Sequence, residues 1–393
     1  MARFLYLVGL LGLAAAADQL KDLGAVLSSI KELSTYNELI HKYPDILLQL
    51  PSYNGIIAPS NDAFKNIPYT ALNGIWDPEN KNITVPLLQY HVLKGTVRTS
   101  DLQLGPTVVR PTLLTDPRYT NVTGGQNVLI DIQPGGESIL TTSLGNRCTI
   151  TDPDIPFQGG VIQVVDHLLI PPPLLNVTAQ TFKLESFLGA LYASDLMPAV
   201  QDEARDVTIF APMDRAMALV GGTLDKLDAK QLARVMGYHV VQGKVIVSSA
   251  LNNGSRFDTM ASSGSGADAI LVRQFGNNKY INSAPIVQPD ILLANGIMHI
   301  IAGVLNPMAA AVIPNATAVS QSAVFPISSE RNPFTSALPC TTNCPVPTSP
   351  AAHNATSTTS IFTSRSKAGA EHHQAVATGH VMIGAALGVL ALI

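Results

Sequence analysis

Apolar side chains recur at spacings of three and four in two stretches of the chain. In the first stretch they stand at positions 20, 23, 26, 27, 30 and 33. In the second they stand at 182, 187, 188 and 191. This spacing gathers apolar side chains on one face of an α-helix, so each stretch is predicted to be a helix that packs on a core.

Runs rich in β-branched residues, separated by glycine, asparagine and proline, predict strands joined by hairpins. In the first half of the chain they cover 55–58, 127–132, 138–142, 147–151 and 160–170. In the second half they cover 207–211, 269–274, 279–282, 285–288 and 296–305. Because helices come first and most strands follow in each half, the predicted fold class is α+β rather than alternating βαβ.

Short motifs occur twice, in the same order. Ile-Ile-Ala-Pro at 56–59 returns as Ile-Phe-Ala-Pro at 209–212, and Tyr-His-Val at 90–92 returns at 238–240. Asp-Ile followed by Gly-Val-Ile, from 154 to 162, returns in similar form from 290 to 298. A period of about 140–150 residues is that of a whole domain, which predicts two copies at 18–173 and 174–307. Asn61 and Asp214 occupy equivalent places in the two copies and are predicted to cap the helix that follows.

The N-terminal residues 1–17 have the pattern of a secretory signal peptide. Arg3 precedes an apolar run at 4–13, which is too short to span a bilayer, and alanines at 15–17 offer a cleavage site. Secretion also agrees with six Asn-X-Ser/Thr sequons, which are Asn82, Asn121, Asn176, Asn253, Asn315 and Asn354.

Beyond residue 307 the composition changes. Ser, Thr, Pro and Ala dominate at 308–368, which predicts a disordered, O-glycosylated stalk. Small residues, a polar spacer and an apolar end at 381–393 match a glycosylphosphatidylinositol attachment signal, with 369–393 removed. Ala368 or Gly369 is the expected attachment site, and Ser364 and Ser366 are alternatives. The expected location is the outer leaflet of the plasma membrane, or the cell wall after release.

The chain has three cysteines and few charges. In an oxidising compartment Cys340 and Cys344 could form a disulfide, whereas Cys148 is expected to be a buried thiol beside a strand. Charged residues make up 13% of the 393 residues and the net charge is −4, which argues against nucleic-acid binding.

The sequence contains no motif of a metalloprotease, a serine hydrolase or a nucleotide-binding loop. Asp152 and Asp154 are close, but only Asp154 has a counterpart, Asp290, which favours a turn or capping role. No cofactor, no metal and no catalytic residue are expected.

The repeated motifs together resemble the fasciclin domain family over residues 20–307. The resemblance rests on Ala-Pro-Ser-Asn-Asp-Ala-Phe at 58–64, on the Tyr-His pairs, and on Asn-Gly-Ile-Met-His-Ile-Ile at 295–301, with their counterparts in the other copy. It implies two tandem domains, each an antiparallel β wedge or sandwich packed with helices. The chain departs from the family pattern at Gln163 (usually His), Ala302 (usually Asp) and Met217 (usually Phe).

The resemblance implies adhesion or wall organisation without catalysis. With the stalk and the lipid anchor it resembles fungal surface proteins of the family, and these two features also suit the plant members. The expected partners are surface or matrix proteins, glycans or a second copy of the chain. Transfer from the family would make Tyr90, His91, Tyr238 and His239 contact residues, but their apolar flanks favour a hydrogen-bonded core. A module that binds a lipid or small apolar ligand is the second hypothesis, and an enzyme acting on wall polysaccharide is the third.

Overall fold

The computed structural model describes residues 20–50, 54–262 and 268–339, and within them two domains with the same order of elements. The helices are α1 (Leu23–Ser29), α2 (Ser34–Lys42), α3 (Asn61–Lys65) and α4 (Lys81–Tyr90) in domain 1, and α5 (Leu175–Thr181), α6 (Glu185–Ala193), α7 (Asp214–Leu224) and α8 (Ala229–Gly237) in domain 2. The strands of domain 1 are β1 (Asn54–Pro59), β2 (Val92–Lys94), β3 (Val108–Pro111), β4 (Asn127–Ile132), β5 (Ser138–Thr141), β6 (Arg147–Phe157) and β7 (Gly160–Val165). Those of domain 2 are β8 (Val207–Pro212), β9 (Val240–Val241), β10 (Arg256–Asp258), β11 (Ala269–Phe275), β12 (Asn278–Ile281), β13 (Ala284–Leu293) and β14 (Gly296–Ile301). The predicted α+β class is confirmed.

Each domain is built on a seven-stranded sheet. The strand order is β2-β1-β7-β6-β5-β4-β3 in domain 1, and β9-β8-β14-β13-β12-β11-β10 in domain 2. All pairs are antiparallel except β1 with β7 and β8 with β14, which are parallel. The sheet of domain 1 curls, because its outer strands meet in a bridge between Leu93 and Thr112. In each copy, the strand that carries the first motif therefore lies beside the strand that carries the last motif.

The glycine that begins β7 and β14 lets the parallel strands approach. A Cβ on Gly160 would lie 2.0 Å from the Asn54 carbonyl oxygen, and one on Gly296 would lie 2.0 Å from the Val207 oxygen. No side chain fits at that distance. The repeated glycine therefore has a structural explanation in both copies.

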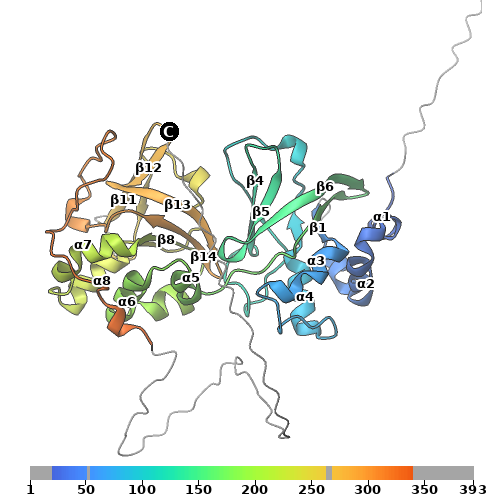
Figure 1. Cartoon of the computed structure of the whole chain (residues 1–393), viewed down its shortest axis with the longest axis horizontal. Coiled ribbons are helices and arrows are strands. Elements are labelled where there is room, and N and C mark those ends of the chain that lie inside the picture. Colours follow the sequence, from blue (N-terminus) through green and yellow to red (C-terminus); the bar gives the residue numbers. More distant parts are fainter. Residues whose placement is uncertain (1–19, 51–53, 263–267, 340–393) are drawn as a thin grey trace, which may run out of the picture. The chain divides into compact units, whose positions relative to one another are not determined.

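Both faces of each sheet are covered by apolar packing. In domain 1, α1, α2 and α4 supply Leu27, Tyr36 and Leu88 to a core that includes Ile56 on β1. The helices gather on one side of the strands (Figure 1). On the other face the curled sheet closes on itself, around residues such as Tyr90 and Leu140. The same two clusters occur in domain 2, so β1 and β8 are buried along their whole length.

Asn61 and Asp214 cap a different helix from the one predicted. Asn61 Oδ1 accepts a hydrogen bond of 3.0 Å from the Thr35 amide at the start of α2. Asp214 Oδ1 accepts one of 3.0 Å from the Ser186 amide at the start of α6. The Ser60 hydroxyl caps α3 itself. The conserved position in the two copies thus ties neighbouring helices together, a contact that spacing along one helix does not reveal.

The first part of the expected stalk is not a free segment in the structure. Within residues 308–339, the later portion packs on domain 2. Ala323, Phe325, Phe334 and Leu338 contact the helical core of that domain. The Glu330 amide donates to the Ala218 oxygen (2.8 Å), and the Gly222 amide donates to the Ser328 oxygen (2.9 Å). Four apolar side chains and these backbone bonds offset the ordering cost that the Ser/Thr/Pro-rich composition implies.

The two domains also touch within the described chain. Leu129 of β4 packs with Leu292 of β13 and Ile297 of β14, and Val109, Val245 and Val247 border this cluster. The two domains are therefore held by an apolar contact as well as by the chain that links them.

Candidate functional site

The Tyr-His pair of domain 1 lies inside the molecule, at the end of α4. Tyr90 is fully buried, and its hydroxyl donates to the Asn127 carbonyl at the start of β4 (2.9 Å). His91 Nδ1 lies 2.8 Å from the Leu87 oxygen, and Nε2 accepts a hydrogen bond from the Leu169 amide (2.9 Å). The pair therefore joins the helix end to the sheet and to the segment after β7.

The pair of domain 2 repeats these contacts one by one. The Tyr238 hydroxyl donates to the Ala269 carbonyl at the start of β11 (3.0 Å). His239 Nδ1 lies 2.8 Å from the Val235 oxygen, and the Leu305 amide donates to its Nε2 (2.9 Å). Tyr238 and His239 are both fully buried.

These hydrogen bonds determine the state of both imidazole rings. A carbonyl only accepts and an amide N–H only donates, so Nδ1 carries the proton and Nε2 does not. Burial lowers the pKa of His91 and of His239 to about 4, against the backbone hydrogen bond at Nδ1, which raises it. The structure thus agrees with the core interpretation of the four residues and leaves none of them a surface from which to contact a partner.

Asp154 and Asp290 have the capping role expected of them. Both adopt left-handed backbone conformations, with φ of 56° and 59°. Asp154 accepts hydrogen bonds from the amides of Thr99 (2.9 Å) and Ser100 (3.2 Å), and from the Thr99 hydroxyl (2.8 Å). Although burial raises the pKa of Asp154, these bonds and one from Gln163 together hold it below the usual value. Asp290 accepts equivalent bonds from the Ser248 amide and hydroxyl.

Gln163 and His299 perform the same task in the two copies. The Gln163 Oε1 accepts from the Asp154 amide (2.9 Å), and its Nε2 donates to the Val97 oxygen (2.9 Å). His299 Nδ1 accepts from the Asp290 amide (3.1 Å), and its Nε2 lies 2.8 Å from the Ile246 oxygen. The departure from the family pattern at Gln163 therefore preserves a donor and an acceptor in their places.

Five of the six predicted glycosylation sites lie in the described chain. Asn82, Asn253 and Asn315 are exposed, and Asn121 and Asn176 are half-buried. Asn354, the cysteines 340 and 344, the attachment residues Ala368 and Gly369 and the signal peptide all lie outside the described residues. Cys148 is a buried thiol on β6, as expected, and burial raises its pKa to about 12.

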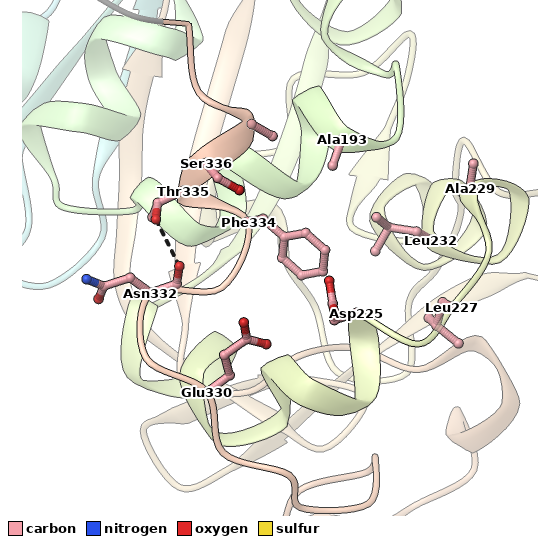
Figure 2. Close-up of a pocket in the computed structure, with 11 residues that line it drawn as sticks. Ala193, Asp225, Leu227, Ala229, Leu232, Glu330, Asn332, Phe334, Thr335 and Ser336 are labelled. Atoms are coloured by element: carbon pink, nitrogen blue, oxygen red, sulfur yellow. Dashed lines mark hydrogen bonds between the residues drawn. The ribbon is translucent and has the colours of Figure 1, made fainter.

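A cavity of about 410 Å³ lies between domain 2 and the C-terminal segment, defined here as residues 323–339. Ala193, Leu227, Ala229 and Leu232 line it from the domain, and residues 330, 332 and 334–337 line it from the segment. Figure 2 shows the Phe334 ring projecting from the segment toward Asp225 and α8. A hydrogen bond of 2.9 Å from the Thr335 hydroxyl to the Asn332 oxygen holds the turn that bears this ring. Sequence reasoning missed the cavity because it assigned the segment to the stalk.

Large apolar side chains are exposed individually on both domains. Tyr69, after α3, is 89% exposed, and Leu48 is 86% exposed. An exposed aromatic ring offers contact area at little cost in side-chain entropy. In the described ranges no group of three or more His, Cys, Asp or Glu is arranged to hold a metal ion. Nor does any helix there have the length and apolar character needed to cross a membrane.

Comparison with known proteins agrees with this geometry. The fasciclin domain model matches residues 31–171 and 182–307, which correspond to the two domains. A fasciclin-like arabinogalactan protein of Arthroderma benhamiae is 29% identical over 78% of this chain and 72% of its own length. One from Cercospora beticola is 26% identical over 73% of this chain and 76% of its own length. Human periostin is 26% identical over 64% of this chain and 28% of its own length.

A solved pair of domains from the insect cell adhesion molecule fasciclin I covers 71% of this chain and 98% of that structure, at 17% identity and a TM-score of 0.33. Since the family model accounts for more than half of the sequence, this chain belongs to the fasciclin domain family and contains two copies of its domain.

Proposed function

We propose that this protein is displayed outside the cell, where its two domains act without catalysis in adhesion or in organising the cell wall. The observation that carries the proposal is the duplicated domain whose motif residues serve internal contacts in both copies. Because these motif residues are buried, we assign binding to the outer surface of the domains, which the chain carries in two copies. Two weak contacts on one molecule strengthen binding through effective concentration, which suits attachment between crowded surfaces.

The proposed location rests on the sequence and on the relatives. The signal peptide at 1–17 and the lipid attachment at Ala368 or Gly369 remain predictions about residues outside the described chain. Several relatives carry the name fasciclin-like arabinogalactan protein and come from fungi, which supports a wall or extracellular setting. Wall glycans, matrix proteins and a second copy of the chain are the proposed partners.

Tyr69 is the contact residue to test first, since the Tyr-His pairs are buried and Tyr69 is 89% exposed. Beads coated with the secreted protein are to be mixed with fungal cells and the bound beads counted. We expect Tyr69→Ala to lower binding several-fold without changing the thermal midpoint. The matched control is Tyr238→Phe, which alters no surface atom and is expected to bind as the unmodified protein does.

The proposal fails if the unmodified protein does not bind and cells lacking it keep normal adhesion and wall strength. Equal binding by Tyr69→Ala and the unmodified protein would keep adhesion and remove Tyr69 from the contact surface.

The cavity beneath the C-terminal segment supports a second candidate, a site for a small, partly apolar ligand. Its volume of about 410 Å³ lies in the range of small-molecule sites. Leu227, Leu232 and Phe334 supply an apolar lining, and Asp225 and Glu330 stand at its polar side. Native mass spectrometry of protein purified from its source checks this candidate. A bound small molecule that Phe334→Ala releases would favour it, and an empty protein would count against it.

A further inference from the structure

One glycosylation sequon lies where domain 1 meets domain 2. Residues 120–126, named here the junction segment, precede β4 and reach the second domain through several hydrogen bonds. The Asn121 amide donates to the Ala294 oxygen (2.8 Å), and the Thr123 amide donates to Asp206 Oδ1 (2.7 Å). Gln126, which is fully buried, donates from Nε2 to the Leu293 oxygen (3.1 Å). The junction segment thus supplies the polar part of a contact whose apolar part is the cluster around Leu129.

The Asn121 side chain takes part in this contact with both of its polar atoms. Its Nδ2 donates to the Ala204 carbonyl oxygen (3.0 Å). Its Oδ1 accepts from Arg205 Nε (3.1 Å). Both partners belong to the loop that leads into β8, so the amide is held between two consecutive residues of the second domain.

The other sequons in the described chain differ from Asn121 in the hydrogen bonding of the side-chain nitrogen Nδ2. The side-chain nitrogens of Asn82, Asn176, Asn253 and Asn315 donate no hydrogen bond there, whereas that of Asn121 does. Since an N-linked glycan is attached through Nδ2, those four residues keep their protein contacts when modified. Asn121 does not.

Glycan attachment changes the Asn121 amide in a defined way. Nδ2 attacks C1 of a sugar carried on a polyprenyl diphosphate, so the Nδ2–C1 bond forms as the C1–O bond breaks. The diphosphate leaves and Nδ2 loses one proton. A secondary amide prefers the trans arrangement, which puts C1 on the same side as Oδ1. The sugar then occupies the space where Arg205 approaches Oδ1.

We propose that Asn121 is a modification site whose occupancy determines whether the two domains dock. Without a glycan, Asn121 holds the loop at Ala204 and Arg205, and the junction closes. With a glycan, the loop is displaced and the domains separate around Pro171–Pro173. Domain 1 precedes domain 2 in synthesis, so Asn121 is accessible before its partner loop exists. This inference rests on the proposed secretion, because secretion brings the chain to the glycosylating enzymes.

Hydrogen exchange measured by mass spectrometry compares the glycosylated and unmodified forms of the junction segment in one sample. The Asn121 and Thr123 amides are protected by domain 2 alone, and a glycan changes the mass of the peptide that contains them. The full chain is to be produced in a secretory host and the two forms of this peptide compared. We expect the glycosylated form to exchange at least tenfold faster than the unmodified form at these two amides.

Two substitutions provide matched controls. Thr123→Ala removes the sequon but keeps the Asn121 side chain and the backbone amide, so it should show the slow exchange of the unmodified form. Ser255→Ala removes the sequon at Asn253, away from the junction, and should leave exchange in the junction segment unchanged.

Each outcome decides the matter. Fast exchange at the two amides in the glycosylated form supports the inference. An Asn121 site left empty while Asn82 and Asn253 are occupied overturns it, because Asn121 is then not a modification site. A glycosylated peptide as protected as the unmodified one overturns the inference and leaves the proposed function intact. If no sequon is occupied, the proposed secretion and this inference fall together.

Discussion

At the scale of single residues, Gln163 and His299 show how one hydrogen-bonding task can be met by two side chains. Each accepts from the backbone amide of a left-handed aspartate and donates to a backbone carbonyl. The Nε2 of His299 must therefore carry the proton, and burial lowers the pKa of this ring despite the nearby Asp290 carboxylate, which raises it. A glutamine keeps the same donor and acceptor and cannot take up a proton.

We accordingly expect His299→Gln to fold as the unmodified protein does. The loss of ring stacking on Phe210 should cost about 1 kcal/mol at neutral pH. The free energy of unfolding, measured by urea titration from pH 7 to pH 5, should depend less on pH than in the unmodified protein. His299→Ala is the contrast, since it leaves the Asp290 amide and the Ile246 oxygen without partners and should cost about 2–3 kcal/mol more. An unchanged pH dependence in His299→Gln would contradict the assignment.

Gly296 supports a second prediction at this scale. Gly296→Ala places a Cβ against the Val207 backbone, where neither strand can move without breaking the parallel pair. We expect a loss of about 3 kcal/mol or more in the free energy of unfolding. Gly135→Ala is the matched control, because the space around Gly135 is open, and its effect should stay within about 0.5 kcal/mol. Similar effects for both substitutions would show that close approach is not the reason for the glycine.

At the scale of elements, the C-terminal segment packs against helices α6 and α7 of domain 2. Gly189 on α6 and Gly222 on α7 leave room for it, since a Cβ on Gly189 would lie 2.2 Å from the Phe334 oxygen and one on Gly222 would lie 2.6 Å from Ser328 Oγ. Backbone bonds from the segment reach Ala218 and Gly222 of α7 itself. Domain 2 therefore includes described residues beyond 307, where the family match ends.

Gly189→Ala tests the docking of this segment, because its expected effect on protein stability is opposite to its effect on an isolated helix. Alanine favours a helix interior by about 1 kcal/mol over glycine, so the isolated helix would gain. In the protein we expect a net loss of about 2 kcal/mol, because the new Cβ displaces Phe334. Trypsin cleavage after Arg331, which is exposed, should become several-fold faster. Increased stability with unchanged cleavage would show that the segment does not depend on Gly189.

At the scale of the whole molecule, the buried histidines are unequally divided. Domain 1 has His91, whereas domain 2 has His239 and His299. The pKa of His91 and His239 falls from about 6.5 in the unfolded chain to about 4 in the folded one. The unfolded chain then binds more protons between these values. Their contribution to stability is complete above pH 6.5 and is lost as the pH falls toward 4, by about 1.4 kcal/mol per unit for each histidine.

Domain 2 should therefore unfold before domain 1 on acidification between pH 6.5 and pH 4. The carboxylate of Asp154, whose pKa is lowered, loses its contribution only below this window. Hydrogen exchange of peptides from each domain, followed at pH 6.5, 5.5 and 4.5, checks the order. His239→Gln should delay the loss of domain 2, and earlier exchange in domain 1 would contradict the prediction.

The sequence by itself determined the duplicated α+β domains, most strands and the capping aspartates, because these follow from local spacing and from motifs that occur twice. It predicted β4 with its observed limits and a turn or capping role for Asp154, but it ended the strand at 151, whereas β6 continues through an irregular register to Phe157. Tertiary structure alone decided the parallel pairing of β1 with β7, the helix that Asn61 caps and the distant partners of Tyr90 and His91. It also decided the docking of residues 323–339 and the contact of Asn121 with Arg205. Each of these depends on groups far apart in the chain, and no local pattern of apolar and polar residues specifies which distant atom completes a hydrogen bond.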